Sequence, residues 1–517
     1  MSFLKSDATV LFRCRAGLPH YILKIVQAVA LVTVTAATAV AETPLLDAAR
    51  HDDRDRAAAL LKARPGITAV NVRAADGATA LHWAAYHDDL LLARMLLKAG
   101  AHAGSADDTG ATPLFLACMN RGGAMVKTLL DAGADANATL VNGETALMTC
   151  SRTGEVTTVR SLLARGADVN RKEPHHDQTA LMWAAAGRHA DVVAALVAAG
   201  ANVHARSRTY TQTVTSEVTQ RRGREELNYA VPRGGSTPLL FAARSGDADS
   251  VRVLLDAGAN VNDALPNGMT ALVEAAHSGN EDVGILLLDK GADPNAADVG
   301  YTALHAAVLR SGTRLVNALL THGANPNVRM TKGTPVRRNS EDFELPATLI
   351  GATPYFLAAK FLEPAIMRAL ASAGADVQLS MKSGDTPLMA AAGMGASPQT
   401  DRRGLSVLDG GRIEDERRVV ESVGAALANG ADVNAANHSG DTAVHAAALL
   451  GYDKVLKQLA EAGAKLDVKN GRGLTALDQI ASKPGAALRS PDRANLGPRQ
   501  STVELLRALS GPSAGRN

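Results

Sequence analysis

The chain repeats one pattern of apolar and polar positions about every 33 residues. Each unit opens with a threonine, continues with Leu and Ala at helical spacing, and adds a second short amphipathic stretch that ends near a glycine. A constant period of this length is typical of stacked repeat arrays, in which each unit buries its apolar face only against its neighbours. The opening threonines are Thr43, Thr79, Thr112, Thr145, Thr179, Thr237, Thr270, Thr302, Thr353, Thr386, Thr442 and Thr475.

The unit around residues 267–295 shows how this pattern predicts local structure. Asn267-Gly268 predicts a turn, because both residues tolerate a positive φ, and Thr270 is an expected helix N-cap. The first short helix should end at Gly279, and a second should run from about residue 281 to residue 289. The buried stripe of this second helix is predicted to comprise Val283, Leu286 and Leu287.

These units resemble the ankyrin repeat. The copies at residues 79–85, 302–307 and 442–447 read Thr-Ala-Leu/Val-His followed by small apolar residues, and the second helix of most units is followed by Gly-Ala-Asp/Asn. The resemblance extends over nearly everything from Thr43 onward. It implies an all-α ankyrin-repeat solenoid of about twelve helix-turn-helix repeats with hairpin turns, which we assign to residues 42–509. Residues 510–517 are expected to be a disordered tail.

Three intervals exceed the period and indicate inserts at about residues 204–235, 328–350 and 393–414. The first alternates β-branched and polar residues and predicts a hairpin arm. The first two enter between repeats and should project from one edge, whereas the third enters between the helices of one repeat and should emerge at the opposite edge. We interpret their arginines as solvated loop charge rather than an anion site, because acidic residues flank them. The arginine pairs are Arg221-Arg222, Arg337-Arg338 and Arg402-Arg403.

The N-terminal residues 1–41 have the pattern of a signal peptide. Basic residues precede an apolar run over residues 25–37, and Ala39-Val40-Ala41 fits the small-residue cleavage motif. We therefore expect export to the periplasm of a Gram-negative bacterium or secretion, with no membrane span after cleavage. The alternative is an uncleaved segment that anchors the chain to the membrane.

Charge and motifs narrow the function classes. The whole chain has 54 Lys and Arg against 52 Asp and Glu, and removal of residues 1–41 leaves 50 against 51. This balance gives no general attraction to nucleic acid. No cysteine or histidine spacing fits a zinc site, and the sequence offers no third metal ligand near His175-His176. The Gly-x-Ser-x-Gly motif of serine hydrolases is absent. We expect no catalytic residues, no metal and no cofactor.

Two cysteines remain after the predicted cleavage, and three histidines share one repeat position. Cys118 and Cys150 occupy first-helix positions usually filled by alanine, so we favour buried free thiols. A disulfide is the less favoured alternative, because stacked helices lie about 8–10 Å apart, which is long for a bridge.

The resemblance to ankyrin repeats implies that the three histidines brace neighbouring turns; they are His82, His305 and His445. Trp83 and Trp183 are predicted to be core residues rather than ligand stackers.

The residues seven and eight positions after each threonine vary between units while the framework repeats. Ankyrin-like proteins bind partner proteins through this concave face and the adjoining turn tips, and the mixture of aromatic, Arg and Met residues is typical of interfaces. The candidate partner-binding residues are Tyr86, His87, Glu144, Arg152, Arg244, Met269, His277, Tyr301, Arg310 and Lys360.

The preferred hypothesis is a monomeric, non-enzymatic scaffold for an unidentified protein partner. The alternatives are a regulatory or carrier subunit of an envelope enzyme or redox complex, and an enzyme with its site among the inserts.

Overall fold

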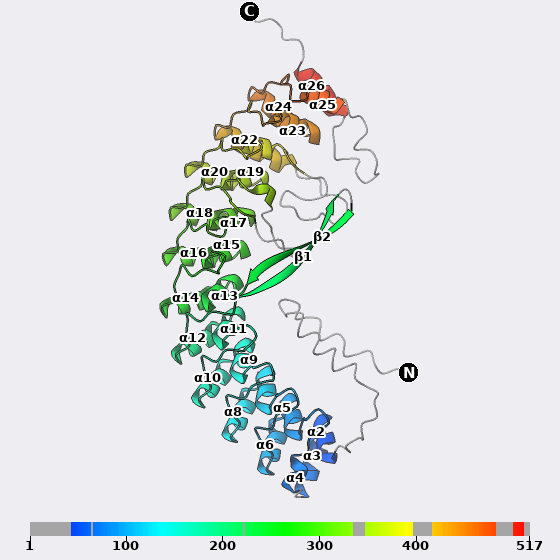
Figure 1. Ribbon diagram of the computed structural model, residues 1–517, viewed down its shortest axis with the longest axis vertical. Helices are drawn as coiled ribbons and strands as arrows, with labels where there is room; N and C mark the ends of the chain where they lie inside the picture. Colours follow the sequence, from blue (N-terminus) through cyan, green and yellow to red (C-terminus); the bar gives the residue numbers. More distant parts are fainter. Residues whose placement is uncertain are drawn as a thin grey trace, which may run out of the picture.

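Two rows of short helices form an elongated arc (Figure 1). The computed structural model describes residues 43–63, 66–220, 223–333, 347–396, 416–481 and 500–510. Within these ranges, twelve helices begin after the twelve threonines and form the inner row of the arc, and each is followed by a helix of the outer row. The predicted signal peptide lies outside the described residues, as does the predicted tail apart from Ser510.

The inner and outer helices are all short. The inner helices are α2 (Pro44–Arg50), α5 (Ala80–Tyr86), α7 (Pro113–Met119), α9 (Ala146–Thr153), α11 (Ala180–Ala186), α13 (Pro238–Ser245), α15 (Ala271–Ser278), α17 (Ala303–Leu309), α19 (Pro354–Lys360), α21 (Pro387–Ala391), α23 (Ala443–Leu450) and α25 (Ala476–Ala481). The outer helices are α3 (Arg54–Lys62), α6 (Leu90–Lys98), α8 (Gly123–Asp131), α10 (Val156–Ala164), α12 (Ala190–Ala198), α14 (Ala248–Asp256), α16 (Glu281–Asp289), α18 (Thr313–Thr321), α20 (Pro364–Ser372), α22 (Glu416–Ala428), α24 (Asp453–Glu461) and α26 (Gln500–Leu509). Two shorter segments, α4 (Ile67–Val70) and η1 (Ala347–Leu349), connect repeats.

Each threonine caps its inner helix, as the sequence predicts. In α15, the Thr270 hydroxyl accepts a hydrogen bond from the backbone N–H of Val273 at 3.3 Å, which satisfies a donor that the helix itself leaves free. The helix then ends at Gly279, whose φ of 77° is accessible to glycine without steric cost. The outer helix α16 has the predicted bounds.

The buried face of α16 is wider than predicted. Val283 and Leu287 are buried, but Leu286 is only partly buried and Leu288 is buried instead. The helix packs against its own inner helix α15 and also against the outer helices α14 and α18 on either side. A helix with neighbours on three sides needs more than one narrow apolar stripe, and the sequence pattern alone underestimates that face.

The cysteine prediction was wrong, because Cys118 and Cys150 form a disulfide that joins α7 to α9. The spacing of 8–10 Å used for that prediction refers to helix axes. Cα atoms on facing sides lie closer by about two helix radii of 2.3 Å each. The Cα–Cα distance is 4.8 Å, which is within the range that disulfides span.

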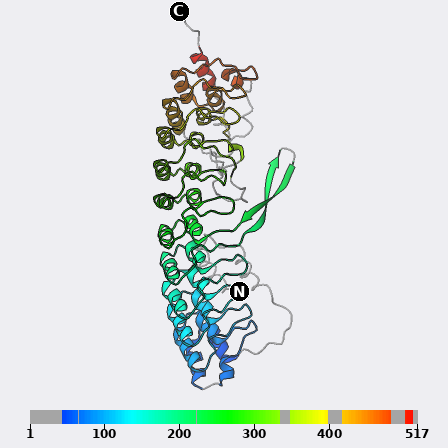
Figure 2. The same cartoon turned by 60° about the vertical axis from the view of Figure 1, so that its left-hand side comes forward.

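The first insert forms the predicted hairpin arm. Strands β1 (Tyr210–Gln220) and β2 (Gly223–Arg233) pair antiparallel, from Tyr210 opposite Arg233 to Gln220 opposite Gly223. Figure 2 shows the hairpin projecting away from the helical rows. Residues 334–346 and 397–415 of the other inserts lie outside the described part, as do all three arginine pairs. The interpretation of those arginines, and the edge from which the third insert emerges, stay predictions.

No helix in the described part of the chain combines the length and the apolar character that crossing a membrane requires.

Candidate functional site

The exposed ends of the inner helices line the concave side of the arc (Figure 1). Tyr86 and Met119, which end α5 and α7, are 55% and 51% exposed. Because these two large apolar side chains lie on inner helices of adjacent repeats, they mark a candidate contact surface. Trp83 supports Tyr86 from one turn earlier, with ring centroids 5.8 Å apart in an edge-to-face arrangement.

Arginines bridge successive repeats along this face. The Arg50 guanidinium lies over the Trp83 ring at 5.2 Å, and Arg152 lies over Trp183 at the same distance. In each pair, the arginine lies seven residues after the threonine that opens its repeat. The tryptophan lies four residues after the threonine that opens the following repeat. The prediction that both tryptophans are core residues was only half right, because both are partly buried on the concave face under an arginine. The bridge fixes both side chains in place and leaves aromatic surface beside a cation.

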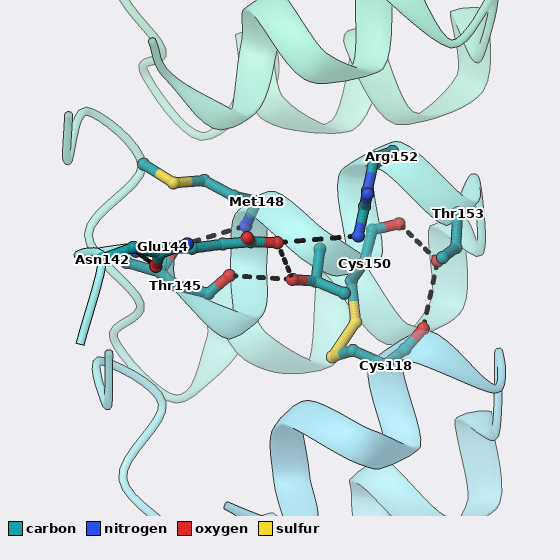
Figure 3. A network of polar contacts seen from close by, with 9 residues as sticks. Cys118, Asn142, Glu144, Thr145, Met148, Cys150, Arg152 and Thr153 are labelled. Carbon is teal, nitrogen blue, oxygen red and sulfur yellow. Dashed lines mark hydrogen bonds and ion pairs between the residues drawn. A yellow bond between two sulfur atoms is a disulfide. The ribbon is translucent and has the colours of Figure 1, made fainter. Parts of the chain in front are cut away.

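A polar network anchors Arg152 next to the disulfide (Figure 3). One Glu144 oxygen accepts a hydrogen bond from the Thr149 hydroxyl at 2.7 Å and lies 3.6 Å from an Arg152 nitrogen. One residue further on, the Thr153 hydroxyl lies 3.2 Å from the Cys118 carbonyl oxygen and 3.0 Å from that of Cys150. This hydroxyl therefore connects the same two helices that the disulfide joins.

The structure separates the predicted binding residues into accessible and buried sets. Seven are exposed or partly exposed at the ends of inner helices: Tyr86, His87, Arg152, Arg244, His277, Arg310 and Lys360. Glu144 has a side chain only 13% exposed and serves as an anchor for Arg152.

Met269 and Tyr301 correct the prediction, because they are 6% and 0% exposed and cannot form a contact surface. Both immediately precede an N-cap threonine. An apolar residue at that position commonly packs inward against the helix that follows, and so fixes the direction in which the chain enters it. The sequence shows this position as variable, but the variation lies in the core.

Three histidines brace the turns, as the resemblance implies. The ring of His305 receives the Thr302 N–H at Nδ1, and its Nε2 lies 3.3 Å from the carbonyl oxygen of Ala352 in the next repeat. His82 and His445 make the equivalent contacts. Burial lowers the pKa of His305 to about 4, and it also lowers the pKa of His82. All three rings are structural cross-links, and burial favours the neutral form of His305 and His82.

Two arginines missed by the sequence analysis hold the stems of the first two inserts. Arg206 donates to the carbonyls of Gly235 and Ala264, both at 2.9 Å. Arg329 donates in the same way to the carbonyls of Gly351 and Ser380, at 2.9 and 2.8 Å. Each arginine thus ties the returning end of its insert to the turn of the next repeat. Both arginines lie six residues after the glycine that ends an outer helix, a signal visible in the sequence.

Backbone pairing shows where these inserts enter. In a regular repeat, the Leu265 N–H donates to the Met269 carbonyl and closes a short turn. At the inserts, the Ser207 N–H donates to the Ser236 carbonyl and the Met330 N–H to that of Ala352. Both inserts therefore replace the tip of a turn, and the array beneath is unchanged.

Comparison with known proteins settles the family. A family model described as "Ankyrin repeats (3 copies)" matches residues 45–140, 114–207, 221–298 and 239–330, and one described as "Ankyrin repeat" matches residues 439–471. Together these matches cover more than half of the chain. The chain belongs to the ankyrin repeat family. Helices α19 to α22 continue the two rows through the unmatched stretch between residues 330 and 439, where the second and third inserts interrupt the period.

One solved structure similar to this ankyrin array is the crystal structure of the human ASB11 ankyrin repeat domain. The two are 26% identical, the alignment covers 49% of this chain and 99% of that chain, and the TM-score is 0.39. A search of curated proteins finds no match. Ankyrin repeats are generally scaffolds for protein–protein interaction, typically without enzymatic activity. In the described residues of this array, no group of three or more His, Cys, Asp or Glu is placed to hold a metal ion.

Arg206→Ala should loosen the hairpin arm. The substitution removes both stem hydrogen bonds and the 2.9 Å ion pair with Asp263, whose side chain is only 10% exposed. We expect a loss of about 1–2 kcal/mol and faster proteolysis within residues 210–233, measured by urea unfolding and limited digestion. Arg252→Ala is the matched control, because it breaks an exposed pair worth no more than about 0.5 kcal/mol. Equal protease sensitivity of the two variants would show that Arg206 does not hold the stem.

Proposed function

We propose that this ankyrin array is an exported, non-enzymatic scaffold that binds a protein partner on its concave face. The observation that carries the proposal is the exposed pair Tyr86 and Met119 beside the ordered platform of Arg50 on Trp83. Aromatic and arginine side chains held rigidly by the fold lose little conformational entropy on binding, and they supply much of the energy in protein interfaces.

The disulfide supports the exported location. Cys118 and Cys150 are both fully buried, and they are joined in the folded chain. Structural disulfides persist in oxidising compartments such as the periplasm and are rare in the cytosol. This agrees with the signal-like pattern of residues 1–41.

A crosslinking pair tests the concave face directly. Tyr86 and Leu91 belong to the same repeat and are 55% and 58% exposed, but Tyr86 lies on inner helix α5 and Leu91 on outer helix α6. Replacing each in turn with a photoreactive benzoylphenylalanine, in the organism that produces the protein, should give covalent protein adducts from position 86 and not from position 91. The adducts are read on gels and identified by mass spectrometry.

Two outcomes would contradict the proposal. Adducts from both positions in equal yield would indicate nonspecific contact, and adducts from position 91 alone would place the partner on the outer row. The location is tested separately, by fractionating cells and determining the N-terminus of the protein. A chain recovered in the cytosol with residues 1–41 intact would rule out export.

A further inference from the structure

The hairpin arm has two exposed strand edges. Strands β1 and β2 form a sheet of two strands, and no third strand pairs with either of them in the part of the chain that the structure describes. The arm projects away from the helical rows, so the rows do not cover its edges (Figure 2). Each edge therefore presents backbone N–H and C=O groups that the hairpin itself does not pair.

The two edges differ in their protection against pairing with another chain. Natural edge strands commonly carry Pro or charged residues, which block the addition of a further strand. β2 has both, because it contains Pro232 and four charged residues. β1 has eleven residues without Pro, Lys or Arg, and Glu217 is its only charged residue. The edge of β1 is therefore open to pairing, whereas the edge of β2 is protected.

Contacts with the array hold only the base of the arm. Arg206 ties the stem, Arg208 pairs with Asp177 at 2.9 Å, and the ring of Tyr210 lies 5.5 Å from that of His176. Beyond the base, the arm is a two-stranded hairpin, which is marginally stable in water without a further strand. β1 is rich in Thr and Val, residue types that favour strands. A third strand on the β1 edge would therefore stabilise the arm along its whole length.

We propose that β1 pairs antiparallel with β1 of a second copy of this chain. The two arms then form one four-stranded sheet in the order β2, β1, β1, β2. Its outer strands are both β2, the protected strand, so the assembly closes as a two-fold symmetric dimer and does not grow further. A strand from an unrelated protein would leave its own far edge open, so this closure favours a second copy.

The sequence of β1 is compatible with pairing to itself. A two-fold axis through Thr215, the middle residue of the strand, overlaps all eleven residues. It places Glu217 opposite Thr213 of the second copy, so no like charges lie opposite each other. Eleven residues span about 37 Å, which leaves the two helical arrays at opposite ends of the shared sheet. This inference does not depend on the proposed function, and it replaces the monomer expected from the sequence with a dimer.

Analytical ultracentrifugation of the native protein measures the pairing. Between about 1 and 100 µM, the average mass should rise from that of one chain towards that of two chains, because association follows mass action. A single chain at every concentration would overturn the inference. Growth beyond two chains would also overturn it, since the β2 edges would then be open to pairing.

Charged variants of β1 test the antiparallel register. Thr213→Lys/Thr215→Lys/Glu217→Lys places lysine opposite lysine across the two-fold axis, and it should weaken dimerisation about tenfold or more. Thr213→Glu/Thr215→Glu keeps Glu217 and should weaken it similarly, because acids then face each other. An equimolar mixture of the two variants should recover the dimer, since opposite charges then face each other. A misfolded arm would not be rescued by mixing.

A matched variant of β2 is the control. Ala230→Lys/Asn228→Lys/Glu226→Lys changes the three residues that lie directly opposite within the arm, and it adds the same charge to the outer strands. It should weaken dimerisation less than about threefold, because these strands lie away from the interface. An equal loss in the β1 and β2 lysine variants, or a mixture of the two β1 variants that stays monomeric, would refute pairing through β1.

Discussion

The double variant Cys118→Ala/Cys150→Ala should unfold at a clearly lower urea concentration than the native protein. The disulfide closes a loop with a sequence separation of 32 residues, and the link restricts the unfolded chain. Loops of this size contribute about 3–4 kcal/mol in the chain-entropy model, within the usual range of about 2–4 kcal/mol. Because repeats stabilise mainly their neighbours, the loss should be largest in α7 to α10 and weaker towards both ends.

Urea titration and hydrogen exchange resolved by helix measure this loss. The native protein treated with dithiothreitol is the control, since it keeps both sulfur atoms and loses only the covalent link. It should unfold close to the double variant, and dithiothreitol should leave the variant unchanged. An unchanged midpoint after confirmed reduction would show that the bridge adds nothing to stability.

Acidification should destabilise the array through His305. Burial lowers the pKa of this ring from its ordinary value of 6.5 to about 4. Between these values the unfolded chain binds a proton that the folded chain does not, so stability is complete above pH 6.5 and falls towards pH 4. The loss approaches about 3 kcal/mol, at about 1.4 kcal/mol per pKa unit. Burial lowers the pKa of His82 in the same direction and adds to the loss.

His305→Gln isolates this contribution. Gln cannot titrate in this range, so the variant should be the less stable protein at pH 7.5 and should lose less stability between pH 6.5 and pH 4.5. Urea midpoints of both proteins at four pH values give the two slopes. If the slopes coincide, another group accounts for the acid sensitivity and the ring of His305 is not the one that resists protonation.

The periodic part of the fold follows from local chemistry that the sequence displays. A threonine that caps a helix, a glycine that ends it and apolar residues at helical spacing are all local, and they give the bounds of α16 correctly. The hydrogen bonds that His305 makes to its N-cap threonine and to the next repeat recur at His82 and His445, because the histidine holds a fixed position in the repeat. The resemblance to ankyrin repeats therefore predicts all three contacts. Contacts between repeats are harder to predict. The disulfide was mispredicted because distances between facing backbones differ from distances between axes.

The candidate site could be predicted in outline but not residue by residue. Tyr86 and Arg244 reach the concave face because the end of an inner helix is exposed there. Met269 and Tyr301 are equally variable, yet they are buried, since variability does not distinguish a changing surface from a changing core. The stacking of Arg152 on Trp183 depends on the distance between successive inner helices, which no single repeat encodes.

The paired stems held by Arg206 and Arg329 make the array tolerant of new loops. Because each insert leaves and rejoins the chain through a closed turn, sequence added between Ser207 and Ser236 adds no strain to the helices below. An unrelated hairpin or a peptide epitope grafted there should be displayed without disturbing the scaffold. The same arrangement allows inserts to be gained or replaced during evolution while the helical array is kept. Related arrays can therefore diverge in what they bind without a change of fold.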